Sequence, residues 1–228
     1  MQFSYSEVID LTMPIVSGTD VVPPGIRNVV PPVSFTLYRR SETDGIQVGE
    51  YQTPIHAGTH LDAPKHVIGD GKTMDDLDMA QFVGMAYCAD VSQVKPNEEI
   101  TARMLEPYAD KIKPGSILFL YTGWNEKMAG TLEYWMESPT LSPEASQWIV
   151  DKGVKFSGYD FFQDKGAKGF KTNPAEFLSH KIILGNGVVQ VEHLTNLSKV
   201  VGTEFFAIGL PLKIKGAEGS PTRVIALR

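Results

Sequence analysis

The sequence predicts a mixed α/β fold. Strand candidates separated by turns fill the first half of the chain, whereas strands alternate with helices in the second half. Of the 228 residues, 42% are hydrophobic and 21% are charged, which is typical of a globular protein with one sizeable core. We therefore expect residues 1–228 to form a single domain.

The first half predicts short strands around an irregular arm. Residues 8–11, 33–38 and 46–51 are strand candidates. Residues 13–32 contain five prolines and two glycines, a composition that opposes regular structure. The same segment carries several valines and isoleucines, so it is too apolar to remain in solvent. We expect this arm to pack on the body of the protein or on a neighbouring subunit.

The second half predicts buried strands and capped helices. The strand candidates are residues 84–91, 116–121, 154–159, 188–192, 204–210 and 222–227. Helices are expected after the capping residues Thr73, Thr101, Ser142 and Asn173. Pro107 interrupts the second of these helices, and the last one carries His180 and ends near residue 185.

Charge and terminal composition exclude several kinds of partner. The net charge of -6 argues against nucleic acid and against an anionic membrane surface. No apolar stretch reaches the roughly 20 residues that span a bilayer. Residues 1–5 lack the basic start and apolar core of a signal peptide. Cys88 is the only cysteine, so an intrachain disulfide is impossible. These features predict a cytoplasmic protein.

Residues 56–66 carry the strongest chemical signal. The segment holds three of the five histidines of the protein and one aspartate. Any one of these residues alone fits a solvated loop, but the four together favour a metal site. His60 and Asp62 are two positions apart and project to the same side of an extended segment. Gly58 permits a bend that brings His56 to that side as well, which gives a ligand set suited to zinc or manganese.

A second pair of candidate ligands lies further along the chain. His180 is expected on a helix and Glu192 at the end of a strand, and a glycine turn at residues 185–187 joins the two elements. Such a unit folds back on itself, so the two side chains can lie close together. The residues alone leave another interpretation equally open, with His180 exposed and Glu192 paired with Lys199.

The pattern His-x-Gly-Thr-His-x-Asp-x-Pro-x-His at residues 56–66 resembles the signature of the cyclase-like metal hydrolases, which include bacterial kynurenine formamidase and isatin hydrolase. Residues 180–185, 189–197, 210–216 and 219–223 also resemble segments of that family. The resemblance therefore covers most of the chain. It implies the swivelling β/β/α fold, with mixed sheets and flanking helices.

The resemblance also implies a ligand set and a catalytic group. His56, His60 and Asp62 would hold one metal ion, and Asp62, His180 and Glu192 would hold another. One or two Zn²⁺ or Mn²⁺ ions per subunit are expected. His66, the last histidine of the motif, would act as the proton shuttle rather than as a ligand.

The expected activity is hydrolysis of the C–N bond of a small aryl or cyclic amide by a metal-activated water. An alternative is an arylformamidase that acts on N-formylkynurenine. A hypothesis of another class is a metal-binding protein without hydrolytic activity. The presence of His66 argues against this hypothesis, because metal binding alone requires ligands but no catalytic base. The chain has no Gly-x-Ser-x-Gly motif, which argues against a serine hydrolase.

Three features depart from the family pattern. Gln163 replaces a small hydroxyl residue, residues 21–25 lack the tryptophan of kynurenine formamidases, and His193 stands where a small polar residue is usual. Aromatic residues at the predicted strand ends fit a flat aromatic substrate or, equally well, the hydrophobic core: Tyr121, Trp124, Tyr159, Phe161 and Phe162. In related enzymes the arm crosses a two-fold axis, so we expect a homodimer or a dimer of dimers.

Overall fold

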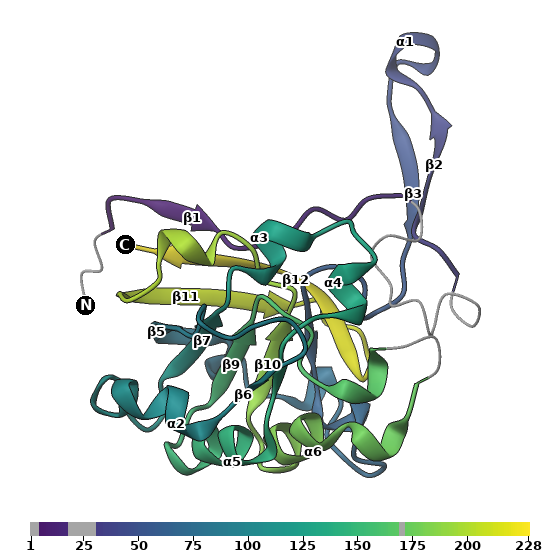
Figure 1. Ribbon diagram of the computed structural model, residues 1–228. Helices are drawn as coiled ribbons and strands as arrows, with labels where there is room; N and C mark the ends of the chain where they lie inside the picture. The colour runs from purple at the N-terminus through teal and green to yellow at the C-terminus, as the bar shows by residue number, and fades with distance from the viewer. Residues whose placement is uncertain (1–4, 18–30, 169–171) are drawn as a thin grey trace.

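A curved eight-stranded sheet forms the centre of the protein, which is described by a computed structural model over residues 5–17, 31–168 and 172–228 (Figure 1). In spatial order the strands are β1 (Val8–Asp10), β12 (Gly219–Leu227), β11 (Glu204–Pro211), β5 (Val83–Asp90), β7 (Ile117–Tyr121), β9 (Phe156–Tyr159), β10 (Val189–Glu192) and β4 (His60–Asp62). The first residues of β12 also pair with β4, which closes the sheet into a barrel-like core. β12 begins at Gly219, earlier than the predicted residue 222, and this extension makes the closure.

Alternating side chains along the strands fill two separate cores. Strands β5, β7, β9 and β10 run parallel, and the other pairs in this sheet are antiparallel. In β7, Ile117 and Phe119 belong to the cluster inside the barrel, whereas Leu118 and Leu120 belong to the cluster that includes the helices. This two-residue period is the expected one for a strand buried on both faces. The predicted α/β class is confirmed.

Helices cover the outer face of the parallel strands, at the lower side of Figure 1. They are α2 (Ala102–Leu105), α5 (Pro143–Asp151) and α6 (Leu178–Gly185). The Ser142 side chain caps α5, as predicted. The expected helix after Thr101 becomes α2 followed by a 3-10 segment, Glu106–Lys111, because Pro107 breaks it. The helix expected after Asn173 divides into a 3-10 turn, Pro174–Glu176, and α6.

The remaining elements are short. They are α1 (Ser41–Asp44), α3 (Trp124–Met128), α4 (Glu133–Met136), a small pair of strands, β6 (Glu99–Ile100) and β8 (Thr140–Leu141), and the 3-10 turns Pro64–His66, Met74–Asp76, Met79–Phe82, Lys165–Ala167 and Leu197–Lys199. Thr73 and Asp76 form a capping box around the second of these turns. In the described part of the chain, no helix has the length and hydrophobicity needed to cross a bilayer.

A two-stranded hairpin projects from the body (Figure 1). It consists of β2 (Ser34–Arg39) and β3 (Val48–Gln52), which pair antiparallel, and α1 lies at its tip. Most of the predicted arm, residues 18–30, lies outside the described residues. At its described beginning, the backbone N–H of Met13 donates to Thr59 Oγ1 over 2.9 Å, so this end of the arm lies beside the histidine segment.

Candidate metal and catalytic site

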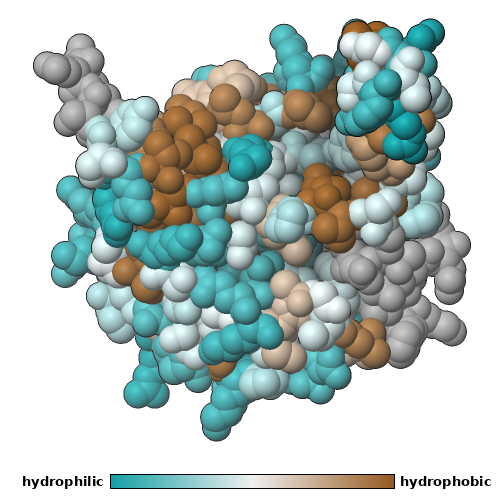
Figure 2. All heavy atoms as spheres, turned by 90° about the horizontal axis from the view of Figure 1, so that it is seen from above, coloured by the Kyte–Doolittle hydropathy of each residue, from teal (hydrophilic) through white to brown (hydrophobic). Residues whose placement is uncertain are grey.

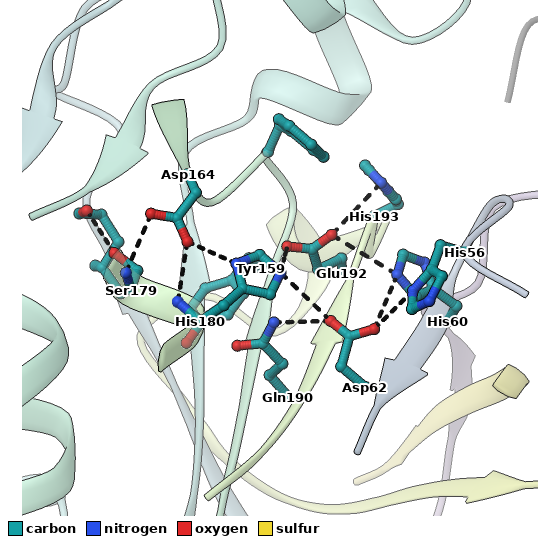
Figure 3. A network of polar contacts seen from close by, with 12 residues as sticks. His56, His60, Asp62, Tyr159, Asp164, Ser179, His180, Gln190, Glu192 and His193 are labelled. Carbon is teal, nitrogen blue, oxygen red and sulfur yellow. Dashed lines mark hydrogen bonds and ion pairs between the residues drawn. The ribbon is translucent and has the colours of Figure 1, made fainter. Parts of the chain in front are cut away.

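Strand β4 supplies the centre of the site because it lies between β10 and β12. His60 pairs with Glu192 in register, and Asp62 pairs with Gln190. The intervening Leu61 lies in the barrel core, so the two polar residues of β4 share the opposite face. Figure 3 shows His60, Asp62, Gln190 and Glu192 gathered around one point. Cross-strand pairing thus joins two segments that are 130 residues apart in sequence.

The segments that flank β4 supply two more histidines. Gly58 has a φ of 63°, and this left-handed turn brings His56 back over the strand. His56 Nδ1 lies 2.9 Å from Asp62 Oδ1. His66 ends the turn after β4, and its ring centroid lies 4.1 Å from that of His56. The three histidines and the aspartate of residues 56–66 therefore meet at one place.

Helix α6 brings His180 to the same point. Its Nε2 atom lies 3.4 Å from Glu192 Oε1 and 3.6 Å from Asp62 Oδ2. On the other side of the ring, Nδ1 lies 2.6 Å from Asp164 Oδ2. The same carboxylate accepts the backbone N–H groups of Ser179 and His180 at the start of α6. Asp164 therefore fixes both the helix and the orientation of the imidazole.

The donor set fits a divalent metal. His60 Nδ1 contacts the Gly58 carbonyl oxygen over 2.9 Å, and because a carbonyl only accepts, Nδ1 carries the proton. The Nε2 lone pair of His60 then faces Asp62 and Glu192, at 3.4 and 3.7 Å. Glu192 Oε1 is buried and accepts no hydrogen bond from the described residues, and Asp62 Oδ1 is buried between His56 Nδ1, at 2.9 Å, and His60 Nε2, at 3.4 Å. Buried carboxylate oxygens without partners are costly, and a metal ion would satisfy them.

The possible ligand atoms form overlapping groups. Asp62, His180 and Glu192 make one group, His56, Asp62 and His66 a second, and His60, Glu192 and His193 a third, with the ligand atoms of each group lying within 4.8 Å of one another. The shared carboxylates allow two neighbouring ions as well as one.

The environment of the site shifts the pKa values of its two carboxyl groups, Asp62 and Glu192, in opposite directions. Burial alone raises the pKa of Asp62, but its interactions with His60 and with the hydrogen-bonding imidazoles of His180 and His56 outweigh it, and the pKa lies well below its ordinary value. Burial and the charge of Asp62 raise the pKa of Glu192. Burial lowers the pKa of His66 to about 3, so its imidazole is neutral at neutral pH. A neutral imidazole can accept a proton.

A cavity of about 280 Å³ opens beside these groups. Phe162, Pro174 and Phe177 supply its apolar lining, with Phe162 against the His193 ring and Phe177 against the His180 ring. Of the aromatic residues expected near the substrate, Phe162 lines the cavity. Tyr159 and Phe161 do not line it and are buried in the cluster that includes the helices. Phe177 was not predicted, because it lies at the break between two helical segments that the sequence joined into one.

Several residues that orient the candidate ligands were also missed. Gln190 donates to Asp62 Oδ2 over 2.7 Å, and its position two residues before Glu192 on one strand was an available signal. Glu218 lies 3.5 Å from His56 Nε2, and Asp164 backs His180. No local pattern marks either of these acids. Gln163 is fully buried, and its side-chain polar atoms have no partner among the described residues.

Comparisons with known proteins show the family of this chain. A family model named Cyclase matches residues 9–163. The chain is 28% identical over 226 residues to a protein named kynurenine formamidase from Bacillus cereus. The aligned residues cover 96% of this chain and 97% of that protein. It is 30% identical over 200 residues to a protein of the same name from Bacillus mycoides, with 85% and 87% of the two chains covered.

Solved structures share the fold. An isatin hydrolase bound to the product analogue thioisatinate superposes with a TM-score of 0.82 and 24% identity, over 97% of this chain and 92% of that chain. Isatin hydrolase A from Labrenzia aggregata gives a TM-score of 0.80 and 22% identity, over 97% and 93% of the two chains. The expected fold is therefore confirmed along nearly the whole length of the chain.

Proposed function

This chain belongs to the cyclase family, and on that premise we propose that it is a metal-dependent hydrolase that cleaves the C–N bond of a small aryl or cyclic amide. One observation carries the proposal. Asp62, His180 and Glu192 converge from three separate elements, and the buried Glu192 Oε1 has no hydrogen-bond partner among the described residues. Such an arrangement is stable when it holds a cation.

We assign the ligands in two overlapping sets. His56 and His60, which lie 2.9 and 3.4 Å from Asp62 Oδ1, would hold one ion with Asp62. Asp62, His180 and Glu192 would hold a second, with Zn²⁺ or Mn²⁺ as the metal. A divalent metal bound here would lower the pKa of water and polarise the substrate carbonyl. Gln190 and Asp164 hold Asp62 and His180 in the orientation that binding requires.

His66 is proposed as the general base and acid. Its neutral imidazole lies beside His56 and lines the cavity in which the substrate would bind. It would take a proton from the attacking water and return it to the departing nitrogen as the C–N bond breaks.

The His66→Ala variant tests this role. It should keep its metal and lose turnover by roughly a hundredfold or more, the usual size of a general acid–base contribution. Elemental analysis and steady-state kinetics on the same preparation measure both quantities. A variant that loses its metal would instead make His66 a ligand.

The cavity favours a flat aromatic substrate. Phe162 and Phe177 offer ring faces, and about 280 Å³ is enough for a bicyclic molecule. A second candidate is arylformamidase activity on N-formylkynurenine, which the names of the curated relatives favour. A metal-binding protein without hydrolysis has no need for a base at His66.

We also propose that residues 1–228 form one domain and that the protein assembles as a homodimer or a dimer of dimers. The hairpin β2–β3 supports this proposal, because it carries large apolar side chains into solvent. Figure 2 looks down on the face from which the hairpin projects and shows further apolar surface there. An isologous contact would cover this surface.

One experiment tests the proposed function. The purified protein, loaded with Zn²⁺ or with Mn²⁺, is assayed against substituted formanilides, N-formylkynurenine and isatin, and its metal content is measured. We expect turnover of at least one amide and tight metal binding that Asp62→Ala abolishes. The control Asp70→Ala alters an exposed acid and should leave both unchanged. Full metal content in Asp62→Ala would contradict the ligand assignment.

A further inference from the structure

His193 occupies an unusual place in the site. It follows Glu192 at the end of β10, is 1% exposed and lines the substrate cavity. Its φ of 59° is uncommon for a residue other than glycine. The Thr59 hydroxyl donates to its carbonyl oxygen over 2.7 Å, and its ring stacks on Phe162 at 5.8 Å with an interplanar angle of 7°. The surrounding structure thus holds both its backbone and its ring.

A chain of polar contacts determines which ring nitrogen carries the proton. The Tyr134 hydroxyl lies 2.6 Å from His193 Nδ1, and Asn125 Nδ2 lies 3.4 Å from the same hydroxyl and 3.7 Å from Met13 Sδ. A thioether sulfur only accepts, so the amide NH₂ of Asn125 is the group that faces Met13 and the tyrosine oxygen. Tyr134 is fully buried, and its own proton then has His193 Nδ1 as its acceptor.

The opposite nitrogen of His193 is therefore protonated. With Nδ1 acting as acceptor, a neutral imidazole carries its hydrogen on Nε2. Nε2 lies 3.9 Å from Glu192 Oε2, which is too long for a hydrogen bond. Among residues 5–17, 31–168 and 172–228, this N–H has no other hydrogen-bond acceptor. A protonated Nε2 also has no lone pair to offer to a metal.

We propose that His193 donates a hydrogen bond from Nε2–H to the acyl oxygen of the amide substrate, and that Tyr134 is the residue that positions it. The inference rests on the proposed function and extends it by one substrate contact. Negative charge develops on the acyl oxygen as water attacks, so a fixed donor at this point stabilises the transition state. The apolar surroundings of Phe162 and Trp135 strengthen such a bond.

The competing role for His193 is that of a metal ligand with His60 and Glu192, to which it lies close enough. The two roles require opposite tautomers, because a ligand needs an unprotonated Nε2. Nitrogen-15 NMR of the Zn²⁺-loaded, histidine-labelled protein separates them, with the His193 signals assigned from their loss in His193→Asn. We expect hydrogen on Nε2 and none on Nδ1. Hydrogen on Nδ1 would overturn the proposal.

Variants then test the role in turnover. In Tyr134→Phe the single Nε2–H tautomer should be lost and kcat should fall by roughly tenfold. His193→Asn suits the left-handed backbone but is too short to replace the donor, so its kcat should fall on the order of a hundredfold, with metal content unchanged. The control Tyr108→Phe removes a hydroxyl that donates to the Asp90 carbonyl, away from the site, and should keep wild-type kcat.

Three further outcomes would count against the proposal. An unchanged kcat in His193→Asn would remove the substrate contact, and metal loss in that variant would make His193 a ligand. A wild-type protein that hydrolyses no amide would overturn the proposed function and the donor role with it. The NMR result does not depend on turnover, so it distinguishes an error about His193 from an error about the reaction.

Discussion

At the scale of single residues, Asp164 has the clearest testable effect on the site. Its carboxylate holds His180 Nδ1 at 2.6 Å and so directs Nε2 toward Asp62 and Glu192. Asp164→Asn places an amide against that nitrogen and loses the charge that orients the ring. Metal affinity should fall by about 10- to 100-fold, measured by calorimetric titration. Asp151→Asn, an exposed acid at the end of α5, serves as the control. Equal affinities in both variants would show that His180 needs no such support.

At the scale of elements, the tight packing of β9 makes the second prediction. A Cβ atom on Gly158 would lie 2.6 Å from a Phe119 ring carbon and 2.7 Å from a Leu194 methyl carbon. Gly158→Ala should therefore lower the free energy of unfolding by about 1–3 kcal/mol, as overpacked cores do. Urea denaturation measures the change. Gly69→Ala has open space around its Cβ and should shift the midpoint little. An unshifted midpoint for Gly158→Ala would mean that Phe119 and Leu194 can move to accommodate the methyl group without a loss of stability.

At the scale of the whole molecule, the hairpin makes the third prediction. Phe35 and Tyr51 face each other across β2 and β3 and are 60% and 47% exposed. Replacing both with serine should weaken self-association and lower turnover, because the proposed subunit contact covers these rings. Sedimentation over a range of protein concentrations, with a parallel assay, measures both effects. The control Met79→Ser alters an apolar side chain that is 52% exposed on the body. If the Phe35→Ser/Tyr51→Ser variant associates and hydrolyses substrate like the wild type, the subunit contact does not involve this hairpin.

Local sequence determined much of the fold and the centre of the site. The caps at Thr73 and Ser142 and the break at Pro107 were predicted because they depend on a few adjacent residues. The convergence of residues 56–66 was predictable for the same reason, since the spacing of His60 and Asp62 and the bend at Gly58 are local properties. The resemblance of this motif to a known family then supplied the expected partners from the distant parts of the chain.

Tertiary structure alone decided which residues support that centre. Asp164, Glu218 and Tyr134 reach the site only after the sheet closes and the helices pack, and their neighbours in sequence give no sign of it. The closure itself depends on the pairing of Gly219 with Asp62, a contact between chain segments that local propensities do not encode. Sequence therefore determined the candidate metal ligands, and long-range packing decided their orientation and hydrogen-bond partners, because these depend on contacts between distant segments.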